Sequence, residues 1–545
     1  MKNKILILSG LCLLGTLSCT KLDQKLQSSI PATSGNSAAA GALLNGTYND
    51  FADAIHGVGG FLNLECNTSD ESLVPTRGGD WDDNGDWRVM HQHTWDPTRG
   101  AFAGAFNTLG KAESDALSTL ASSPTAVQSD EALFLLSLAQ FYFIDFFGQV
   151  PYRELASYNS IQPAPVYTPT QAVDAIVTRL NGIITRNALP GSNSPNRASI
   201  NATKFLLMKV LLNKGAFLNR AAPTFADADM QQVVTLGNQL IASGAYSLNT
   251  NYFNNFGPNN ATTSTEAVWA WPNNGSSSNN GINAGSTNQR WMNTLHYNSW
   301  NLPSVVGGAG WNGFSTVADF YNMFEGHGDG TPTTVIDTTK DRRLGGRYYP
   351  GVTDVSGLRP GLLAGQQYNA NGTKQKDRQG NDLTFMPAVA AVETNAQTLE
   401  RTGIRVIKYP PDYSNYNGGN QRNQFQIFRY ADVILMVAEA KMRQATPDAA
   451  GALVLINTLR VNRGATPWAT LTLVDAANVS NPNTLLAERG REMYWENWRR
   501  QDLIRFGVFL KPWALKTASD PKELLFPIPS DQLIANPNLK QNSGY

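Results

Sequence analysis

The stretch between residues 485 and 507 constrains the fold more than any other part of the chain. Its sequence, LLAERGREMYWENWRRQDLIRFG, predicts one helix that begins after Thr484 and ends at Gly507. Trp495 and Trp498 lie three positions apart and would share one face of that helix. A helix that carries two large aromatic rings must bury them against other segments, so this stretch predicts a packed, central element.

Charged residues form a second pattern in the same stretch. Glu488, Glu492 and Glu496 recur every four residues, and Arg500 continues the row. Side chains four apart on a helix are neighbours, so the row predicts ion pairs on a partly buried face. A glycosidase would instead need two carboxyl groups facing each other across a cleft, which three residues on one helix face do not provide. We therefore interpret these carboxylates as structural.

Helical periodicity extends over most of the chain. The segment 131–147 is apolar nearly all round and predicts a buried helix. Paired antiparallel helices with short turns suggest a mostly α fold. The other predicted helices cover residues 36–55, 98–121, 170–187, 201–219, 226–243, 427–444 and 447–463.

Two regions interrupt the helical pattern, at about residues 67–97 and 249–402. Eight of the twelve tryptophans lie in them. Aromatic rings stack on the apolar faces of sugar rings and amide groups reach the hydroxyls, so these insertions are candidates for a glycan site. The alternative is that the tryptophans fill the core beneath long loops, as tryptophan is mostly buried in proteins.

The segment Arg77–Asp86 of the first insertion, RGGDWDDNGD, is polar and rich in glycine. Asp80, Asp82, Asn84 and Asp86 have the spacing that begins an EF-hand calcium loop. However, the twelfth position holds a histidine where a bidentate glutamate is needed, so a solvated acidic turn remains the simpler interpretation.

The N-terminus has the pattern of a signal peptide. Lys2 and Lys4 precede a thirteen-residue apolar run from Ile5 to Leu17, too short for a membrane span. Cys19 follows the small residue Ser18, as in a bacterial lipobox. We expect a signal peptide over residues 1–18, lipidation at Cys19 and a polar tether over residues 19–37. The alternative is an ordinary secreted protein with a free or disulfide-bonded Cys19.

Charge and motif content narrow the possible functions. Lys plus Arg equals Asp plus Glu at 43 each, and no concentrated basic segment predicts nucleic-acid binding. Three cysteines, two of them in the first nineteen residues, predict no disulfide framework. We find no nucleotide-binding loop, serine elbow or HExxH motif.

Several ordered segments resemble the SusD/RagB family. The stretch 485–507 resembles the C-terminal signature of that family, and residues 147–152, FGQVPY, resemble another of its landmarks. Further similarity lies in residues 429–440, 455–464, 526–530 and 536–545. With the N-terminal features, the resemblance covers the whole chain.

The resemblance implies a single domain over residues 38–545, with a tetratricopeptide-like scaffold of helical pairs and long, loop-rich insertions that carry short strands. It implies a non-catalytic lipoprotein of the outer membrane that captures glycans at the cell surface and delivers them to a SusC-like TonB-dependent transporter. No cofactor is expected. A peptide-binding lid of the same family, or a glycoside hydrolase or lyase, remains an alternative.

Residue by residue, the resemblance places Trp81 and Asn84 at positions of the family's aromatic arc. The candidate site around them includes Arg77, Asp80 and Asp82 of the same segment. Further rings of the arc are expected among Trp291, Tyr297, Trp300 and Trp311, although the segment at Trp311 also resembles a structural landmark of the family.

Overall fold

The structure is a computed structural model that describes residues 37–192, 196–285, 287, 289–299, 310–329, 331, 336–345, 360–368, 373–393, 397–412 and 420–545. The candidate residues Cys19 and Trp300 lie outside the described residues. Residues Asn36–Tyr545 group into one compact unit. All that follows concerns this unit.

The unit is mostly helical, as the periodicity predicts. The helices of the scaffold and of residues 485–507 are α1 (Ser37–His56), α3 (Gly100–Ala121), α4 (Ala126–Phe147), α5 (Pro169–Arg186), α6 (Ile200–Leu218), α7 (Asp227–Ala242), α11 (Tyr430–Arg443), α12 (Ala449–Asn462), α13 (Leu485–Met493) and α14 (Arg499–Arg505). The remaining α-helices of the described residues are α2 (Asp86–Gln92), α8 (Asn260–Thr263), α9 (Gln289–Met292), α10 (Ala318–Tyr321) and α15 (Ser530–Ala535).

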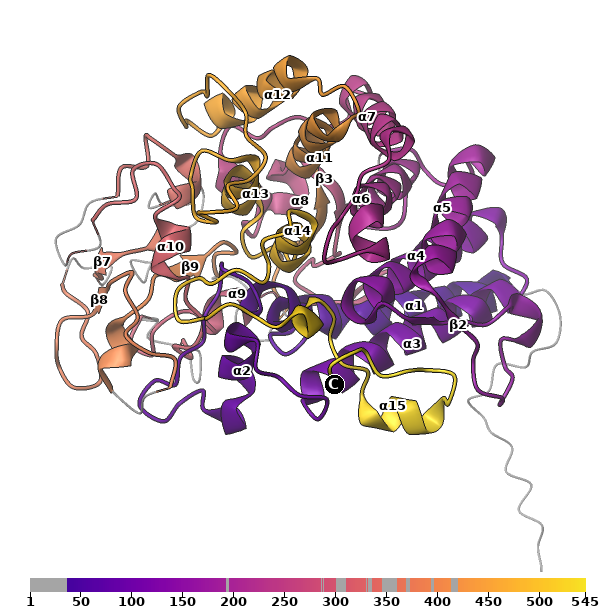
Figure 1. Cartoon of the computed structure of the whole chain (residues 1–545), viewed down its shortest axis with the longest axis horizontal. Helices are drawn as coiled ribbons and strands as arrows, with labels where there is room; N and C mark the ends of the chain where they lie inside the picture. Colours follow the sequence, from indigo (N-terminus) through magenta and orange to yellow (C-terminus); the bar gives the residue numbers. More distant parts are fainter. Residues whose placement is uncertain are drawn as a thin grey trace, which may run out of the picture. The chain divides into compact units, whose positions relative to one another are not determined.

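The long helices pack largely in chain order, which confirms the predicted scaffold of helical pairs. Contacts run from α1 to α3, then from each helix to the next as far as α7, and from α11 to α12. Helix α7 also packs against α11, although almost two hundred residues separate them. The second insertion therefore leaves the scaffold after α7 and returns to the same place before α11 (Figure 1).

Short strands occur in the second insertion and at its base, as predicted, and one further pair lies between α4 and α5. The strands in the described residues are β1 (Val150–Pro151), β2 (Val166–Tyr167), β3 (Ala267–Ala270), β4 (Ser278–Asn279), β5 (Ile282–Asn283), β6 (Gly361–Leu363), β7 (Gly365–Gln366), β8 (Thr384–Phe385), β9 (Arg405–Ile407) and β10 (Gln426–Arg429). They form five antiparallel pairs, and the pair β3–β10 joins the two ends of the second insertion at its base. Because β10 leads directly into α11, this pair fixes the insertion to the helical scaffold.

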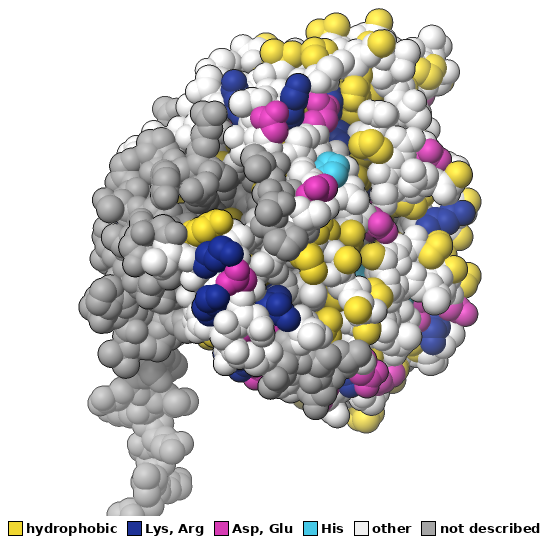
Figure 2. All heavy atoms as spheres, turned by 90° about the vertical axis from the view of Figure 1, so that its left-hand side faces the viewer, with side chains coloured by type: hydrophobic (Ala, Val, Ile, Leu, Met, Phe, Trp, Pro, Cys, Tyr) yellow, Lys and Arg dark blue, Asp and Glu magenta, His cyan; other side chains and the backbone are white. Residues whose placement is uncertain are grey.

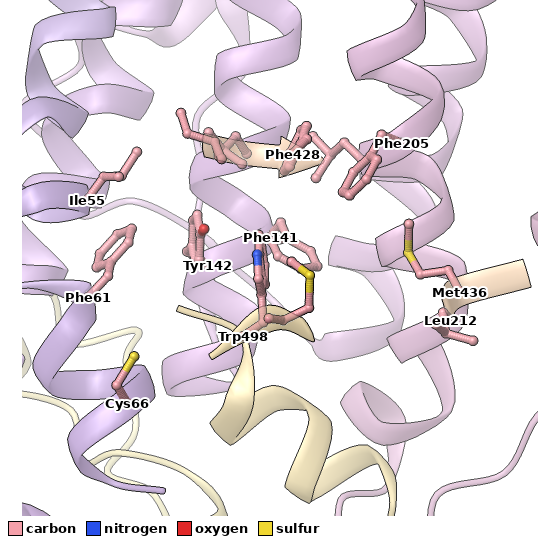
Figure 3. Packing of buried hydrophobic residues seen from close by; sticks show 14 of the residues in the cluster. Ile55, Phe61, Cys66, Phe141, Tyr142, Phe205, Leu212, Phe428, Met436 and Trp498 are labelled. Carbon is pink, nitrogen blue, oxygen red and sulfur yellow. The ribbon is translucent and has the colours of Figure 1, made fainter. Parts of the chain in front are cut away.

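Helix α4 lies at the centre of the core. Its N-terminus carries a capping box between Thr125 and Gln128, and Gly148 ends it in the left-handed conformation. Figure 3 shows Phe141 and Tyr142 of α4 beside Trp498, which follows α13. The ring of Phe428, from β10, stacks on the ring of Phe205 on α6, with 4.3 Å between the ring centroids. The base of the insertion and the C-terminal segment thus share one core with the helical scaffold.

The single helix predicted over residues 485–507 is wrong. Helix α13 ends at Met493, and α14 begins at Arg499. Between them Trp495 and Asn497 have φ values of 56° and 66°, which no right-handed helix accommodates. The turn is held from outside, because the Asn497 amide donates to the Ile55 carbonyl at 3.2 Å. Tertiary hydrogen bonding therefore overrides the local helical pattern.

Because the helix breaks, Glu496 becomes part of a buried network of ion pairs. Its carboxylate accepts hydrogen bonds from Arg429 of β10 at 2.8 Å and from Lys408 at 2.6 Å. Glu492 on α13 accepts from Arg429 at 2.7 Å and from Arg463, which follows α12, at 2.8 Å. These side chains are all almost inaccessible to solvent. The structural interpretation of the carboxylates is thus correct, although two separate segments supply them.

Other charged groups extend this network. Glu488 accepts hydrogen bonds from Arg343 at 2.7 Å and from Arg460 at 2.6 Å. Burial disfavours the ionised form of Glu492, but the guanidinium groups of Arg463 and Arg429 outweigh it and hold the pKa of Glu492 well below its usual range. The second insertion, α12 and the C-terminal segment are therefore joined through charges that cannot be removed singly without leaving a buried ion unpaired.

Arg500 does not continue the glutamate row as predicted. Its guanidinium lies 3.7 Å from Asp145 of α4 and donates a hydrogen bond to the Leu524 carbonyl at 3.0 Å. It also covers the ring of Phe526 at 4.3 Å. Because α14 is a separate helix, Arg500 points toward α4 and the C-terminal segment, away from Glu492.

We expect Glu492→Gln to lower the free energy of unfolding by about 3–5 kcal/mol at pH 7, because it leaves buried guanidinium groups without their counter-charge. The folded-state pKa of Glu492 is lower than its unfolded value of about 4.5, so its contribution is complete above that pH and declines as the pH falls below it. Chemical denaturation from pH 7 to pH 3 should show the difference between the two proteins narrowing in acid.

The control is Glu154→Gln, which removes the same charge from an exposed side chain. It should change the free energy of unfolding by no more than about 0.5 kcal/mol. Equal stability of Glu492→Gln and the parent at pH 7 would contradict the role given to the network.

Candidate functional site

Four aromatic side chains gather in one groove of about 460 Å³. Trp81 and Trp87 come from the first insertion, and Tyr297 and Trp311 come from the second. The remaining lining residues are Val58, Asp80 and Asp83. Residues more than two hundred positions apart in sequence thus form a single surface, and three of the predicted rings, Trp81, Tyr297 and Trp311, lie on it.

Trp81 is held in a strained backbone conformation. Its φ is 62°, a left-handed value that bulky residues rarely adopt and that costs of order 1–3 kcal/mol. The indole N–H donates to the Trp311 carbonyl at 2.6 Å, and the ring lies edge-to-face with Phe314 at 5.6 Å. Gly313 permits this approach, because a Cβ atom there would lie 2.3 Å from the indole. The two insertions therefore fit together around the Trp81 ring, which remains half-buried.

Trp311 offers the most exposed large ring of the groove. Its side chain is 42% exposed, while its backbone N–H donates to the Met292 carbonyl at 2.6 Å. The next residues of this loop continue the pairing, since the N–H groups of Gly313 and Phe314 both donate to the Asn293 carbonyl. The backbone at Trp311 is thus fixed, and its ring is left to face the groove.

Tyr297 is oriented by its neighbours. Its hydroxyl donates to the carboxylate of Asp80, and the guanidinium of Arg378 covers its ring at 4.1 Å. Arg378 also pairs with Asp80 at 3.1 Å and with the buried carboxylate of Glu400 at 3.2 Å. Burial and the hydrogen bond to Asp80 raise the pKa of Tyr297 above its ordinary value. The phenol therefore stays neutral at physiological pH.

Arg77 and Trp291 lie away from the groove surface. The guanidinium of Arg77 is fully buried and donates to the Gly313 carbonyl at 3.1 Å, to the Thr402 carbonyl at 2.9 Å and to the Ser315 hydroxyl at 3.0 Å. It therefore ties the two insertions together beneath the groove. Trp291 packs in a small hydrophobic cluster between α9 and the strands β6 to β9. Neither side chain is presented to a ligand in this conformation.

Two acidic residues of the first insertion are paired with arginines. Asp82 pairs with Arg88 at 2.5 Å, and Asp86 pairs with Arg99 at 2.7 Å. Asn84, with a φ of 54°, is exposed at the turn between them. Within the described residues no three Asp, Glu, His or Cys side chains form a group that could hold a metal ion.

The sequence places Trp87 among the loop tryptophans, but it does not identify Trp87, Val58 or Asp83 as site residues. Trp87 lies on α2, and its indole N–H donates to the Asp83 carboxylate at 2.5 Å. Its ring is edge-to-face with Trp81 at 5.3 Å. The signal that could have identified it is the spacing, since two tryptophans six residues apart flank a glycine-rich turn. Chemically, the groove offers ring edges and faces together with carboxylate acceptors, as a binding surface for sugars requires.

Comparison with known proteins places this geometry in context. The sequence model of the SusD family matches residues 265–545, just over half of the chain. The starch-binding protein SusD of Bacteroides thetaiotaomicron is 24% identical, with 85% of this chain and 82% of that protein covered. The SusD-like protein P38 of Formosa agariphila is 25% identical over 177 residues, which span 32% of this chain and only 33% of that protein.

Solved structures share the fold. A SusD superfamily protein from Parabacteroides distasonis has a TM-score of 0.66 at 17% identity, covering 94% of this chain and 100% of its own. The surface glycan-binding protein A from Bacteroides thetaiotaomicron, solved in complex with laminarihexaose, has a TM-score of 0.64 at 16% identity, covering 93% of this chain and 99% of its own. From the match to its sequence model and the agreement in fold, we conclude that this chain belongs to the SusD family.

Proposed function

We propose that this chain is a non-catalytic, cell-surface glycan-binding lipoprotein that captures oligosaccharide or polysaccharide and delivers it to a SusC-like TonB-dependent outer-membrane transporter. The observation that carries the proposal is the groove in which Trp81, Trp87, Tyr297 and Trp311 converge from two insertions. Aromatic rings fixed around an open groove suit the apolar faces of sugar rings, and they need no charge on the ligand.

The relatives support the choice of ligand class. One is a starch-binding protein, and another is a surface glycan-binding protein solved with a glucan oligosaccharide. In this chain the proposed ligand surface comprises Trp81, Tyr297, Trp311 and Asp80 from the sequence-based candidates, with Trp87 and Asp83 added from the structure. Arg77 supports the surface from below.

Binding without catalysis fits the placement of the carboxylates. The glutamates of α13 that would have been candidates for acid–base chemistry are buried among guanidinium groups, with no space for a sugar between them. In the groove, Asp80 accepts from Tyr297 and pairs with Arg378, which holds it in a fixed ionic contact. A general acid must be free to donate a proton to a glycosidic oxygen, whereas this carboxylate is already engaged by a phenol and a guanidinium group.

Anchoring by lipid is the second part of the proposal. In the portion of the chain that the structure describes, no helix is long and apolar enough to cross a membrane. The anchor would be Cys19, where a lipid group adds about 0.8 kcal/mol of membrane affinity per buried methylene. The polar residues 20–37 would then tether the glycan-binding unit to the membrane.

The function is tested with the purified full chain in affinity gels that contain starch, laminarin, dextran or xylan, and with an assay for reducing ends. Retarded migration without release of reducing ends supports a binding protein. Release of reducing ends would favour the hydrolase alternative. Binding to a panel of peptides with no binding to any polysaccharide would favour a peptide-binding lid.

Trp311→Ala should weaken binding of the retained glycan by about 1–3 kcal/mol, or roughly five- to more than a hundredfold in Kd, because one apolar platform is lost. Stability should change little, because the ring is exposed and the carbonyl that accepts from Trp81 stays in place. Isothermal titration and thermal melting measure the two effects separately.

The matched control for Trp311→Ala is Trp468→Ala. Trp468 is half-buried and lies outside the groove, where Arg460 covers its ring at 4.1 Å. This variant should bind the glycan as tightly as the parent protein. If Trp311→Ala bound the glycan as tightly as the parent protein, or if the two variants had equal affinities, the groove would not be the glycan site.

Cys19→Ala should leave the protein folded but release it from the membrane fraction, because the lipid attachment point is lost. Fractionation of cells expressing the parent and the variant, followed by immunoblotting, measures this. A conservative control is Cys12→Ala, which keeps Cys19. Equal membrane retention of Cys19→Ala and the parent would contradict lipid anchoring at this position.

A further inference from the structure

We infer that the aromatic groove is selective for uncharged glycans and disfavours polysaccharides that carry carboxylate or sulfate groups, with Asp83 as the main discriminating residue. This inference rests on the proposed glycan-binding function and names the substrate class of that site. It follows from the charged residues around the groove, where negative charges are less fully paired than positive ones.

Both charged residues that line the groove are acids. Asp80 and Asp83 are the ionisable carboxylates among its lining residues, and no lysine or arginine is among the described residues that line it. Asp80 is balanced by Arg378 at 3.1 Å. Asp83 is exposed and accepts from the indole N–H of Trp87, but it forms no ion pair with any described residue. Among the described residues, one negative charge at the edge of the aromatic surface therefore has no ion-pair partner.

The arginines that flank the groove are already engaged by carboxylates. Each of three arginines contacts two acidic side chains: Arg88 contacts Asp82 and Glu393, Arg99 contacts Asp86 and Asp96, and Arg378 contacts Asp80 and Glu400. An anionic sugar that approached one of these arginines would have to displace a carboxylate from it. On the face of the molecule shown in Figure 2, basic side chains likewise lie beside acidic ones.

The sequence between the two second-insertion rings adds no positive charge. Residues 298–310, which connect Tyr297 to Trp311, contain no Lys, Arg, His, Asp or Glu. An anionic ligand held between these rings would therefore meet the carboxylate of Asp83 without a compensating group from that segment. Two like unit charges about 5 Å apart in water weaken binding by roughly fourfold, and by more where solvent is partly excluded.

The variant Asp83→Asn tests the effect of this charge alone. The amide oxygen of asparagine keeps an acceptor for the Trp87 indole, and only the charge is removed. We expect the affinity for an anionic polysaccharide, relative to its neutral parent, to rise about three- to tenfold at low ionic strength, because the charge repulsion is lost. The gain should shrink in 0.5 M salt, where the Debye length is only a few ångströms.

The experiment uses the purified full chain and whichever neutral polysaccharide the affinity gels retain, together with its carboxymethyl and hydroxyethyl derivatives. The two substituents are similar in size, so a difference between them reports charge. Isothermal titration is carried out for the parent, for Asp83→Asn and for Asp531→Asn, which removes the same charge from an exposed position on α15, outside the groove-lining set.

The inference predicts that the parent binds the hydroxyethyl derivative more tightly than the carboxymethyl derivative, and that Asp83→Asn but not Asp531→Asn reduces the difference. It is overturned if the carboxymethyl derivative binds as tightly as the hydroxyethyl one, or if Asp83→Asn leaves their ratio unchanged. If no polysaccharide of any kind is bound, the proposed glycan-binding function itself is overturned, which is a different result.

Discussion

The contact between Arg429 and the two glutamates Glu492 and Glu496 holds the rest of the structure in place. One guanidinium from the strand β10 reaches the carboxylates of both, one on α13 and one on the turn that follows it. Because β10 closes the second insertion, this single side chain joins the insertion to the C-terminal segment. Every group involved is buried, so the charges must remain together or the fold must open.

Burying so many charges is an expensive way to join segments, since each ion loses its hydration. The structure offsets that loss by giving each carboxylate several donors. Glu492 alone accepts from Arg343, Arg429 and Arg463, which arrive from three different parts of the chain. A hydrophobic core could supply similar stability, but it would not require these particular segments to meet. The network therefore specifies where the insertion packs. The apolar core around α4 and Trp498 stabilises the fold as a whole (Figure 3).

The position of the second insertion creates the groove. The second insertion is fixed at its base by β3 and β10, and farther out it is tied to the first insertion through the buried Arg77. With both loops held, the Trp81 indole can donate to the Trp311 carbonyl, and Tyr297 can meet Asp80. The rings are then oriented before any ligand arrives, which lowers the entropy that binding has to overcome.

The sequence by itself determined most of the helices and the two insertions from which the rings of the groove come. Apolar periodicity and local caps, such as Thr125 before α4, act within a few turns of chain and can be read directly. The same local information placed Trp81 in a polar loop that cannot bury itself. It also predicted that Trp495 and Trp498 pack inside the protein, as they do.

Only the tertiary structure decided which rings face the groove and where the C-terminal helix breaks. Trp81 and Trp311 meet across 230 positions, while Trp291 in the same insertion turns into a core. The helix stops after Met493 because Asn497 bonds to the Ile55 carbonyl, a partner that no local pattern reveals. Burial and hydrogen bonding between distant segments are properties of the folded chain, and they outweigh local propensities of a few tenths of a kcal/mol per residue.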